Sequence, residues 1–563
     1  MRAASSRSLR ALLRVQTLPQ PPPLLTAPAF VSGPLPRSVW QHRGGIHSTS
    51  STRMDCTLGP HASPWAINAA LIAAQTPAEA LQTAADAGNQ LNAVNQATLL
   101  HRLAKAVRSE QCTLGPEDMG RLRLVQDAFL SLLQRDLVGD RALATTLWSA
   151  AVLHSCGVSL NDGFAVALVK CAHNRVHFFS EQSLANASYA AALLKLPGSA
   201  DFVLACWRAA RACIPGFAPQ GIAQMVWAAA TLKVYPGAVS VDVFLRQLVL
   251  RSSEFKHLEI GQIAWALAEL KHRPPRPVFD ALDASMAEEV NCCSAQTLSN
   301  TLWACAVLGH MPARILAALS EPDAVAHVHA LLAESEASPI MARDAAVLSF
   351  SCAVLGAFNT PVFHAAWKTA CALPPTAFSP EGLCMLFQTT LLAAAAQADG
   401  ANLNDAPLPC LPAPLDSACE HMWRTFAVAK PTVSDYHTLV SRALDAMSVP
   451  HTLEGRTHDG LLSIDVVIQG TDVVVDATTG APATIALEVD GPSHFAVNTR
   501  TPLGRTRARN ALLRCRGWTV VSVPYFEWRL HNRSVDHQTA YLKSRLEQDG
   551  HALVRPPADE LTA

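Results

Sequence analysis

A repeat in the middle of the chain constrains the fold more than any other feature of the sequence. Five segments align without gaps, each around one aromatic residue: Trp148, Tyr189, Trp227, Trp265 and Trp303. Their successive spacings are 41, 38, 38 and 38 residues, and degenerate copies surround His101, Phe350 and Phe387. A period near 38 residues accommodates two helices and two turns, and it is typical of solenoids in which neighbouring repeats bury a common core. The chain is therefore expected to be mainly an α-helical repeat solenoid, over residues 55–396.

The aromatic residue belongs to a helix that is apolar nearly all round. Leucine or isoleucine stands five residues before it, leucine five after it and alanine three after it, as in Leu143, Leu153 and Ala151. A helix with this pattern must lie inside the array. We therefore expect the aromatic residues to be core rather than a platform for stacking bases.

One column of the same helix is polar and stands three residues before the aromatic: Thr145, Asn186, Gln224, Gln262 and Asn300. In solenoids that read single-stranded RNA, a few polar side chains at fixed positions select one base per repeat. Alternatively, these side chains satisfy polar groups inside the protein, which the buried setting favours. Lysines recur six residues after the aromatic, at Lys195, Lys233 and Lys271, where they could touch phosphates or complement the helix dipole; the second interpretation is preferred.

Residues 1–54 differ from the rest of the chain. They contain seven arginines, frequent serine and no acidic residue, which is the composition of an organellar transit peptide. The stretch RGGIHSTSS favours import into the mitochondrial matrix, with the chloroplast stroma as the alternative. Without this segment the chain has 37 basic against 45 acidic residues, so the mature protein is acidic.

The cysteines and the apolar runs exclude several classes of protein. The chain has 15 cysteines without a C-x-x-C pair, so neither zinc-ligand spacing nor a disulfide framework is present in the sequence. The long uncharged runs are interrupted by proline, asparagine and histidine, and no membrane insertion is expected.

After the repeats the sequence changes character. Residues 397–416 contain four prolines and indicate a linker, 417–447 a helical connector, and 551–563 a tail. Between them, residues 448–550 alternate in the manner of strands at SIDVVI, TDVVV, TIALEVD and TVVSVPY, with helices expected at 502–516 and 536–548. This order predicts a small β-β-β-α-β-α domain.

The segment 455–547 strongly resembles the RAP domain found at the C-terminus of organellar RNA-binding proteins, including those of the FAST kinase family. The resemblance is carried by Glu488-Val-Asp490-Gly-Pro-x-His494-Phe, Gly517-Trp518, Pro524-Tyr525 and Glu527-Trp528. It implies an α/β fold like that of the PD-(D/E)xK nucleases. Residues 140–395 resemble the octotricopeptide repeats of organellar RNA-maturation factors, although the proline-rich PPPEW signature is absent.

The nuclease resemblance suggests four catalytic candidates: Asp465, Glu488, Asp490 and His494. Asp465 and Glu488 would hold Mg²⁺ or Mn²⁺, and His494 would act as general base. The lysine expected two residues after Glu488 is replaced by Asp490, which removes a cation that stabilises developing charge. Binding without catalysis, and hence no cofactor, is therefore the preferred interpretation.

An arginine cluster without acidic residues follows the RAP motif: Arg500, Arg505, Arg507, Arg509, Arg514 and Arg516. Arg505, Arg509 and Arg516 share one helical face and are expected to contact RNA phosphates, with Trp528 as an exposed stacking residue. The sequence thus predicts a factor for processing, stability or translation of organellar mRNA or rRNA, with ribosomal or RNA-processing proteins as further partners. The alternatives are a metal-dependent endoribonuclease and a protein-binding scaffold.

Overall fold

The computed structural model describes residues 62–109, 114–333, 339–398, 400, 410–427, 434–469, 473–531 and 534–553. The expected transit peptide (1–54), the middle of the expected linker (401–409) and the end of the tail (554–563) lie outside the described residues. The described residues fall into two compact units, which divide between Gln247 and Leu248. Within the described part of the chain, no helix is both long enough and apolar enough to cross a membrane.

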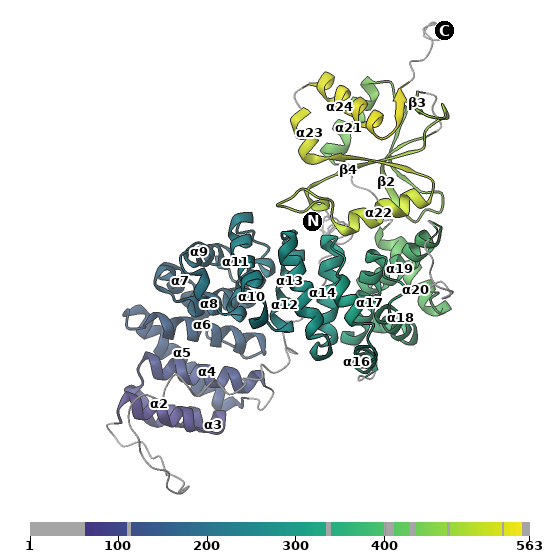
Figure 1. Cartoon of the computed structure of the whole chain (residues 1–563). Helices are drawn as coiled ribbons and strands as arrows, with labels where there is room; N and C mark the ends of the chain where they lie inside the picture. Colours follow the sequence, from purple (N-terminus) through teal and green to yellow (C-terminus); the bar gives the residue numbers. More distant parts are fainter. Residues whose placement is uncertain are drawn as a thin grey trace. The chain divides into compact units, whose positions relative to one another are not determined.

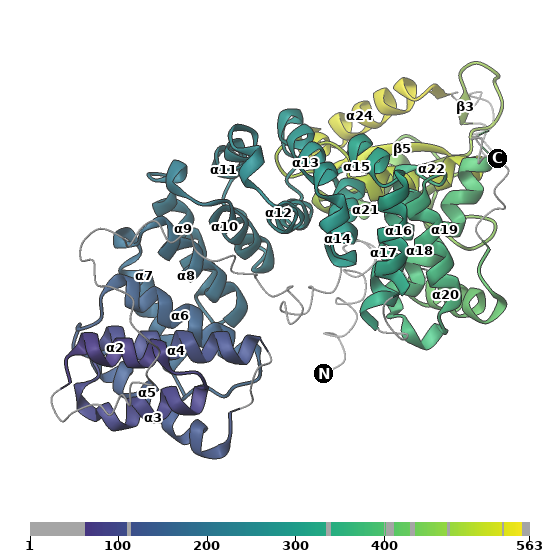
Figure 2. The same cartoon turned by 60° about the horizontal axis from the view of Figure 1, so that its bottom comes forward.

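In its described residues, the first unit contains helices and no strand (Figure 1). Its helices are α2 (Pro64–Ala73), α3 (Pro77–Ala87), α4 (Ala93–Arg108), α5 (Pro116–Gln134), α6 (Asp140–Ser155), α7 (Phe164–Asn174), α8 (Glu181–Leu194), α9 (Ser199–Ala210) and α10 (Pro219–Thr231). Helix α11 (Ala238–Leu250) leads into the second unit. The aromatic column lies on α4, α6, α8 and α10, which pack on one another in this order as the inner row (Figure 2).

The second unit begins with further repeats. Its helices are α12 (His257–Glu269), α13 (Arg276–Glu288), α14 (Ala295–Leu308), α15 (Ala313–Ala318), α16 (Pro322–Ala333), α17 (Pro339–Leu355), α18 (Pro361–Ala372), α19 (Pro380–Ala398) and α20 (Ala413–Ala427). The inner helices α12, α14, α17 and α19 again pack in sequence, and α20 packs on α19, with the rings of Phe387 and Trp423 6.0 Å apart. The segment expected as one connector, 417–447, therefore contains most of α20, which extends the helical array, and all of α21 (Asp435–Ala446), which belongs to the next domain.

The recurring lysines mark the ends of inner helices. Lys195, Lys233 and Lys271 have φ angles of 49°, 55° and 53°, and in later repeats glycine takes the corresponding position at Gly309 and Gly356. After Lys271 the chain closes with two main-chain hydrogen bonds, from Lys271 N to Ala268 O and from His272 N to Leu267 O. This is the Schellman arrangement, in which a left-handed residue satisfies the last carbonyls of a helix. The lysine column is thus a helix-termination position.

The C-terminal domain is built on a four-stranded sheet of order β1-β2-β4-β5. The strands are β1 (Thr452–Arg456), β2 (Ser463–Ile468), β4 (Ile485–Asp490) and β5 (Thr519–Pro524); β4 and β5 are parallel and the other pairs antiparallel. Helix α22 (Gly504–Cys515) supplies the crossover that a parallel pair requires. Strands β3 (Val474–Asp476) and β6 (His551–Leu553) form a separate pair, and α23 (Tyr525–His531) and α24 (Val535–Gln548) follow β5.

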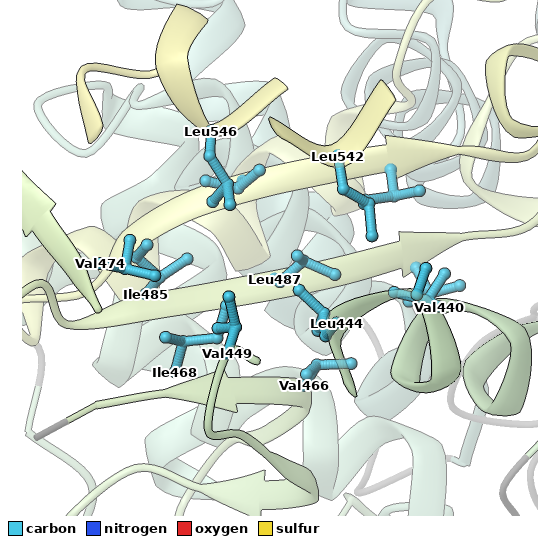
Figure 3. Packing of buried hydrophobic residues seen from close by; sticks show 14 of the residues in the cluster. Val440, Leu444, Val449, Val466, Ile468, Val474, Ile485, Leu487, Leu542 and Leu546 are labelled. Atoms are coloured by element: carbon cyan, nitrogen blue, oxygen red, sulfur yellow. The ribbon is translucent and has the colours of Figure 1, made fainter. Parts of the chain in front are cut away.

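The two faces of this sheet have different surroundings because side chains alternate along each strand. Figure 3 shows one face, where Val466, Ile468, Ile485 and Leu487 meet α21 and α24 in an apolar core. The opposite face carries Glu488 and is covered by α22. Helix α22 also packs on α14, α17 and α19, so the domain is joined to the array through its crossover helix.

Candidate nucleic-acid interface

In the polar column of the inner helices, only Thr145 makes a side-chain hydrogen bond within the described part of the protein. Thr145 Oγ1 donates to the Arg141 carbonyl at 2.8 Å, an ordinary contact within a helix. Asn186, Gln262 and Asn300 are half-buried and Gln224 is 7% exposed. In the described part of the chain, none of these four amides makes a hydrogen bond to another protein group. The suggestion that the column satisfies internal polar groups therefore holds for Thr145 alone.

The aromatic column lies one turn further along the same helices and is packed away. Tyr189 and Trp227 are each 6% exposed, with their rings 4.9 Å apart, and Trp265 and Trp303 are each 2% exposed. Aromatic rings this buried cannot stack on bases. Beside them Asn186, Gln262 and Asn300 are half-buried, whereas Gln224 is as buried as the rings. This burial of the rings is the core role that the sequence predicts for the aromatic residues, except that Trp148 is only half-buried, with its ring 5.3 Å from that of His101.

The RAP arginines do not form an exposed row. Arg509 donates through Nε and Nη2 to the two carboxylate oxygens of Glu488, at 3.0 and 3.1 Å, and through Nη2 to the Ser463 carbonyl. Arg516 Nε lies 2.7 Å from Asp459 Oδ2. These guanidinium groups are committed to carboxylates of their own domain, which leaves them little capacity to bind phosphate.

Arg505 points into the helical array instead of toward solvent. Its guanidinium carbon lies 5.8 Å from the centre of the Phe350 ring, a cation–π arrangement. Burial lowers the pKa of Arg505 to about 10, and the nearby charge of Glu269 partly opposes that shift. The expected phosphate track of Arg505, Arg509 and Arg516 is therefore replaced by internal contacts, because α22 lies between the sheet and the array.

The loop before α22 fastens the domain to the ends of the inner helices. Val497 N donates to Lys271 O at 2.9 Å, and Asn498 bonds both the main-chain N and the main-chain O of Arg273, at 2.9 and 2.8 Å. Gly504 rests on the Ala306 carbonyl, where a Cβ would overlap the oxygen. The left-handed turn at Lys271 is thus a docking point for the RAP domain.

Three arginines of the cluster remain exposed: Arg500, Arg507 and Arg514. Arg507 lies against Gly309 at the end of α14, and partial burial together with the charge of Arg273 lowers its pKa. Arg500 lies over the Phe526 ring at 5.2 Å. Trp528 is only 2% exposed and packs near Tyr436 and Tyr541, so the expectation of an exposed stacking residue is wrong: α23 turns this ring into the core.

The four catalytic candidates do lie close to one another. Asp465, Glu488 and Asp490 are each 2% exposed, and Asp465 Oδ2 accepts a hydrogen bond from Val489 N at 2.9 Å. Asp490 accepts from the Ser522 hydroxyl and lies 2.9 Å from His494 Nδ1. Burial raises the pKa of Glu488, and Arg509 counteracts part of that rise. The result is a polar cluster around the buried Glu488 and the partly buried Arg509.

A metal held jointly by Asp465 and Glu488 does not fit this arrangement, because both Glu488 oxygens accept from Arg509. Among the described residues, the set with metal-ligand spacing is instead His437, Glu454 and Asp465, whose ligand atoms lie within 4.8 Å of one another. The sequence does not predict His437 and Glu454 as candidate ligands, because no motif links a helix at 435–446 to a strand at 452–456. His437 Nδ1 is already 3.1 Å from Glu454 and its Nε2 3.7 Å from Asp465, so the imidazole itself bridges the two carboxylates.

Fold and site together define a helical-repeat protein that ends in a RAP domain. The family model for the RAP domain matches residues 487–545, and the model for the Tbc2 translation factor, N-terminal domain, matches residues 128–308. Both the predicted RAP domain and its place after a helical array are confirmed. Because RAP domains are usually associated with RNA, the chain has an RNA-related role in general terms.

One curated relative is the "RAP domain-containing protein, chloroplastic" of Oryza sativa subsp. japonica. It is 27% identical over 188 residues, which cover 32% of this chain and 26% of the relative. The alignment therefore spans about a quarter of the relative's length. Its chloroplast location fits an organellar protein.

Proposed function

We propose that this protein binds single-stranded organellar RNA along its inner helices and acts in processing, stability or translation of the transcript. The observation that carries the proposal is the set of four amides, one per repeat, without a partner inside the described protein: Asn186, Gln224, Gln262 and Asn300. Each amide offers both a donor and an acceptor, which suits the edge of an unpaired base. The match to a translation factor domain supports translation among the three activities.

The charge of the chain predicts how such binding responds to salt. Outside residues 1–54 acidic residues outnumber basic ones, and Arg505, Arg509 and Arg516 of the RAP cluster contact groups within the protein. Few phosphates are then neutralised, so affinity is expected to fall only weakly with salt. Most of the affinity must come from contacts to bases, and the complex should prefer some sequences over others.

The test is RNA binding by the full chain and by a variant with alanine at all four amide positions. We expect at least tenfold weaker binding of an unstructured RNA by the variant, because several base contacts are lost together. A matched variant replaces Thr145, whose hydroxyl is used inside its own helix, and should bind as the unaltered protein does. Equal affinity of the fourfold variant and the unaltered protein would overturn the proposal.

The compartment is a separate part of the proposal. The arginine-rich segment 1–54 supports import into the mitochondrion, while the relative with a chloroplast location supports the plastid. A fluorescent fusion of the full chain, imaged with markers for both organelles, distinguishes them. Signal that remains in the cytosol would contradict organellar import altogether.

A second candidate function, RNA cleavage, is favoured by the contact between Asp490 and His494. The Nδ1 contact at 2.9 Å orients the ring, and in the described residues Nε2 makes no hydrogen bond, as a general base requires. Cleavage of labelled RNA with Mg²⁺ or Mn²⁺ should then be lost in His494→Ala. Cleavage that persists in this variant, or the absence of cleavage in the unaltered protein, would exclude the nuclease.

A further inference from the structure

Two cysteines from different segments of the chain meet beside the last helices of the array. Cys371 lies on α18 and Cys410 shortly precedes α20, and the Cys371 thiol donates a hydrogen bond to the Cys410 carbonyl over 3.8 Å. The two residues are 39 positions apart, so the fold and not the local sequence brings them together. Both thiols are free; Cys410 is exposed and Cys371 is half-buried.

The two thiols differ in reactivity. Burial raises the pKa of Cys371 to about 11, and the charge of a Cys410 thiolate adds to this rise, so the two sulfur atoms lie within electrostatic reach of each other. A protonated thiol reacts slowly with oxidants, because the thiolate is the nucleophile. The exposed Cys410 is therefore the sulfur that an oxidant in solution meets first.

Two further cysteines of the same region are shielded from solvent. Cys384 on α19 and Cys419 on α20 are 2% and 0% exposed. Burial is also the main reason that the pKa of each of these two thiols rises to about 12. A dissolved oxidant consequently reaches the pair of Cys371 and Cys410 before it reaches these two residues.

We infer that Cys371 and Cys410 form a disulfide when a hydroperoxide oxidises Cys410. The Cys410 sulfur attacks the peroxide, which is reduced to water as the sulfur becomes a sulfenic acid. The Cys371 sulfur then attacks the sulfenic sulfur, the S–S bond forms, and a second water leaves. Contact between the two residues offsets the slow reaction of Cys371, because a group held next to its target acts as if at high concentration.

The disulfide fastens a helix that touches the RAP domain. Helix α20 begins at Ala413, shortly after Cys410, and on it Trp423 Nε1 donates to the Leu461 carbonyl at 2.8 Å. A disulfide restricts the chain that it closes. Oxidation therefore holds α20 more firmly on the array, and with it the turn that precedes β2. This inference does not depend on RNA binding.

The experiment treats the full chain with hydrogen peroxide, blocks the remaining thiols and maps the disulfides by mass spectrometry. Trypsin is unsuitable because it leaves all four cysteines on one peptide, residues 369–424. Glu-C cleaves after Glu381, and Asp-N cleaves before Asp405 and Asp416. Together they place on separate peptides Cys371, Cys384, Cys410 and Cys419. The expected product joins the peptides of Cys371 and Cys410, and dithiothreitol separates them.

Single variants test the order of the two steps. Cys371→Ser should prevent the joined product and raise the yield of Cys410 sulfinic acid roughly tenfold, because a second peroxide then oxidises the sulfenic acid. Cys410→Ser should leave Cys371 as a thiol. Limited proteolysis between α20 and the RAP domain should slow about threefold on oxidation of the unaltered protein, and in neither variant. Cys292→Ser, which removes an exposed cysteine elsewhere, is the matched control and should leave the joined product unchanged.

Three results would contradict the inference. The first is a disulfide that joins Cys371 to Cys419 in place of Cys410. The second is Cys410 sulfinic acid in the unaltered protein without any joined product. The third is a joined product that leaves the rate of proteolysis unchanged, which would overturn the fastening of α20.

Discussion

Lys195, Lys233 and Lys271 occupy a backbone conformation that glycine adopts more easily. A residue with a Cβ is destabilised by about 1–2 kcal/mol in the left-handed region. Glycine avoids this strain, but it has more conformational entropy in the unfolded chain and loses it on folding. We therefore expect Lys233→Gly to raise the free energy of unfolding by up to about 1 kcal/mol. Urea denaturation of the full chain measures this change.

The matched control for that substitution is Lys233→Ala, which keeps the backbone strain and removes the side chain beyond Cβ together with its charge. It should leave stability within about 0.5 kcal/mol of the unaltered protein. If Lys233→Gly instead destabilises the protein, the lysine side chain contributes packing that outweighs its backbone strain. RNA affinity measured on the two variants also shows whether the Lys233 side chain contributes to RNA binding.

At the scale of elements, helix α22 is shared between two layers of structure. It covers the charged face of the RAP sheet through Arg509 and packs on the array through Arg505. Arg505→Ala removes the cation beside Glu269 and the contact with Phe350, so we expect a loss of about 2–4 kcal/mol. Thermal denaturation together with limited proteolysis between the array and the RAP domain would detect it.

Arg514→Ala provides the comparison on the same helix, because Arg514 is exposed. Its stability should change by less than about 0.5 kcal/mol. Equal effects of the two substitutions would show that Arg505 does not fasten the domain to the array.

The strands and inner helices could be predicted because their patterns are local. SIDVVI coincides with β2 at 463–468, and every aromatic of the column lies on an inner helix. Strand β1 was missed because TLEGR contains a glycine and two charges; Gly455 is needed there, since a Cβ would overlap the Val467 side chain. Its antiparallel pairing with β2 cannot be predicted from the local sequence, because it depends on how the strands assemble into the sheet.

The role of the arginine cluster could not be read from composition. A run of arginines predicts a cationic surface only if nothing covers it, and here the covering groups lie far away in the sequence. Asn498 and Arg273, for example, are 225 residues apart. Such contacts leave no periodic signal, and they decide whether an arginine meets phosphate or protein.

At the scale of the whole molecule, the RAP domain has its own apolar core, built entirely from residues between Val440 and Leu546. A fragment of residues 434–553 should therefore fold when expressed alone. In the full chain its crossover helix is covered by α14, α17 and α19. Separation of the fragment uncovers Arg505 and the side of Arg507 that lies against Gly309.

This docking has a consequence for the biochemistry of dissected domains. The isolated fragment should bind RNA without sequence preference and with a steeper dependence on salt, because Arg505 and Arg507 then join the exposed Arg500 and Arg514 in contacting phosphates. The intact chain should show the opposite behaviour, and filter binding at two salt concentrations compares them. An RNA affinity measured on the fragment would then include phosphate contacts by side chains that, in the complete protein, lie against the helical array.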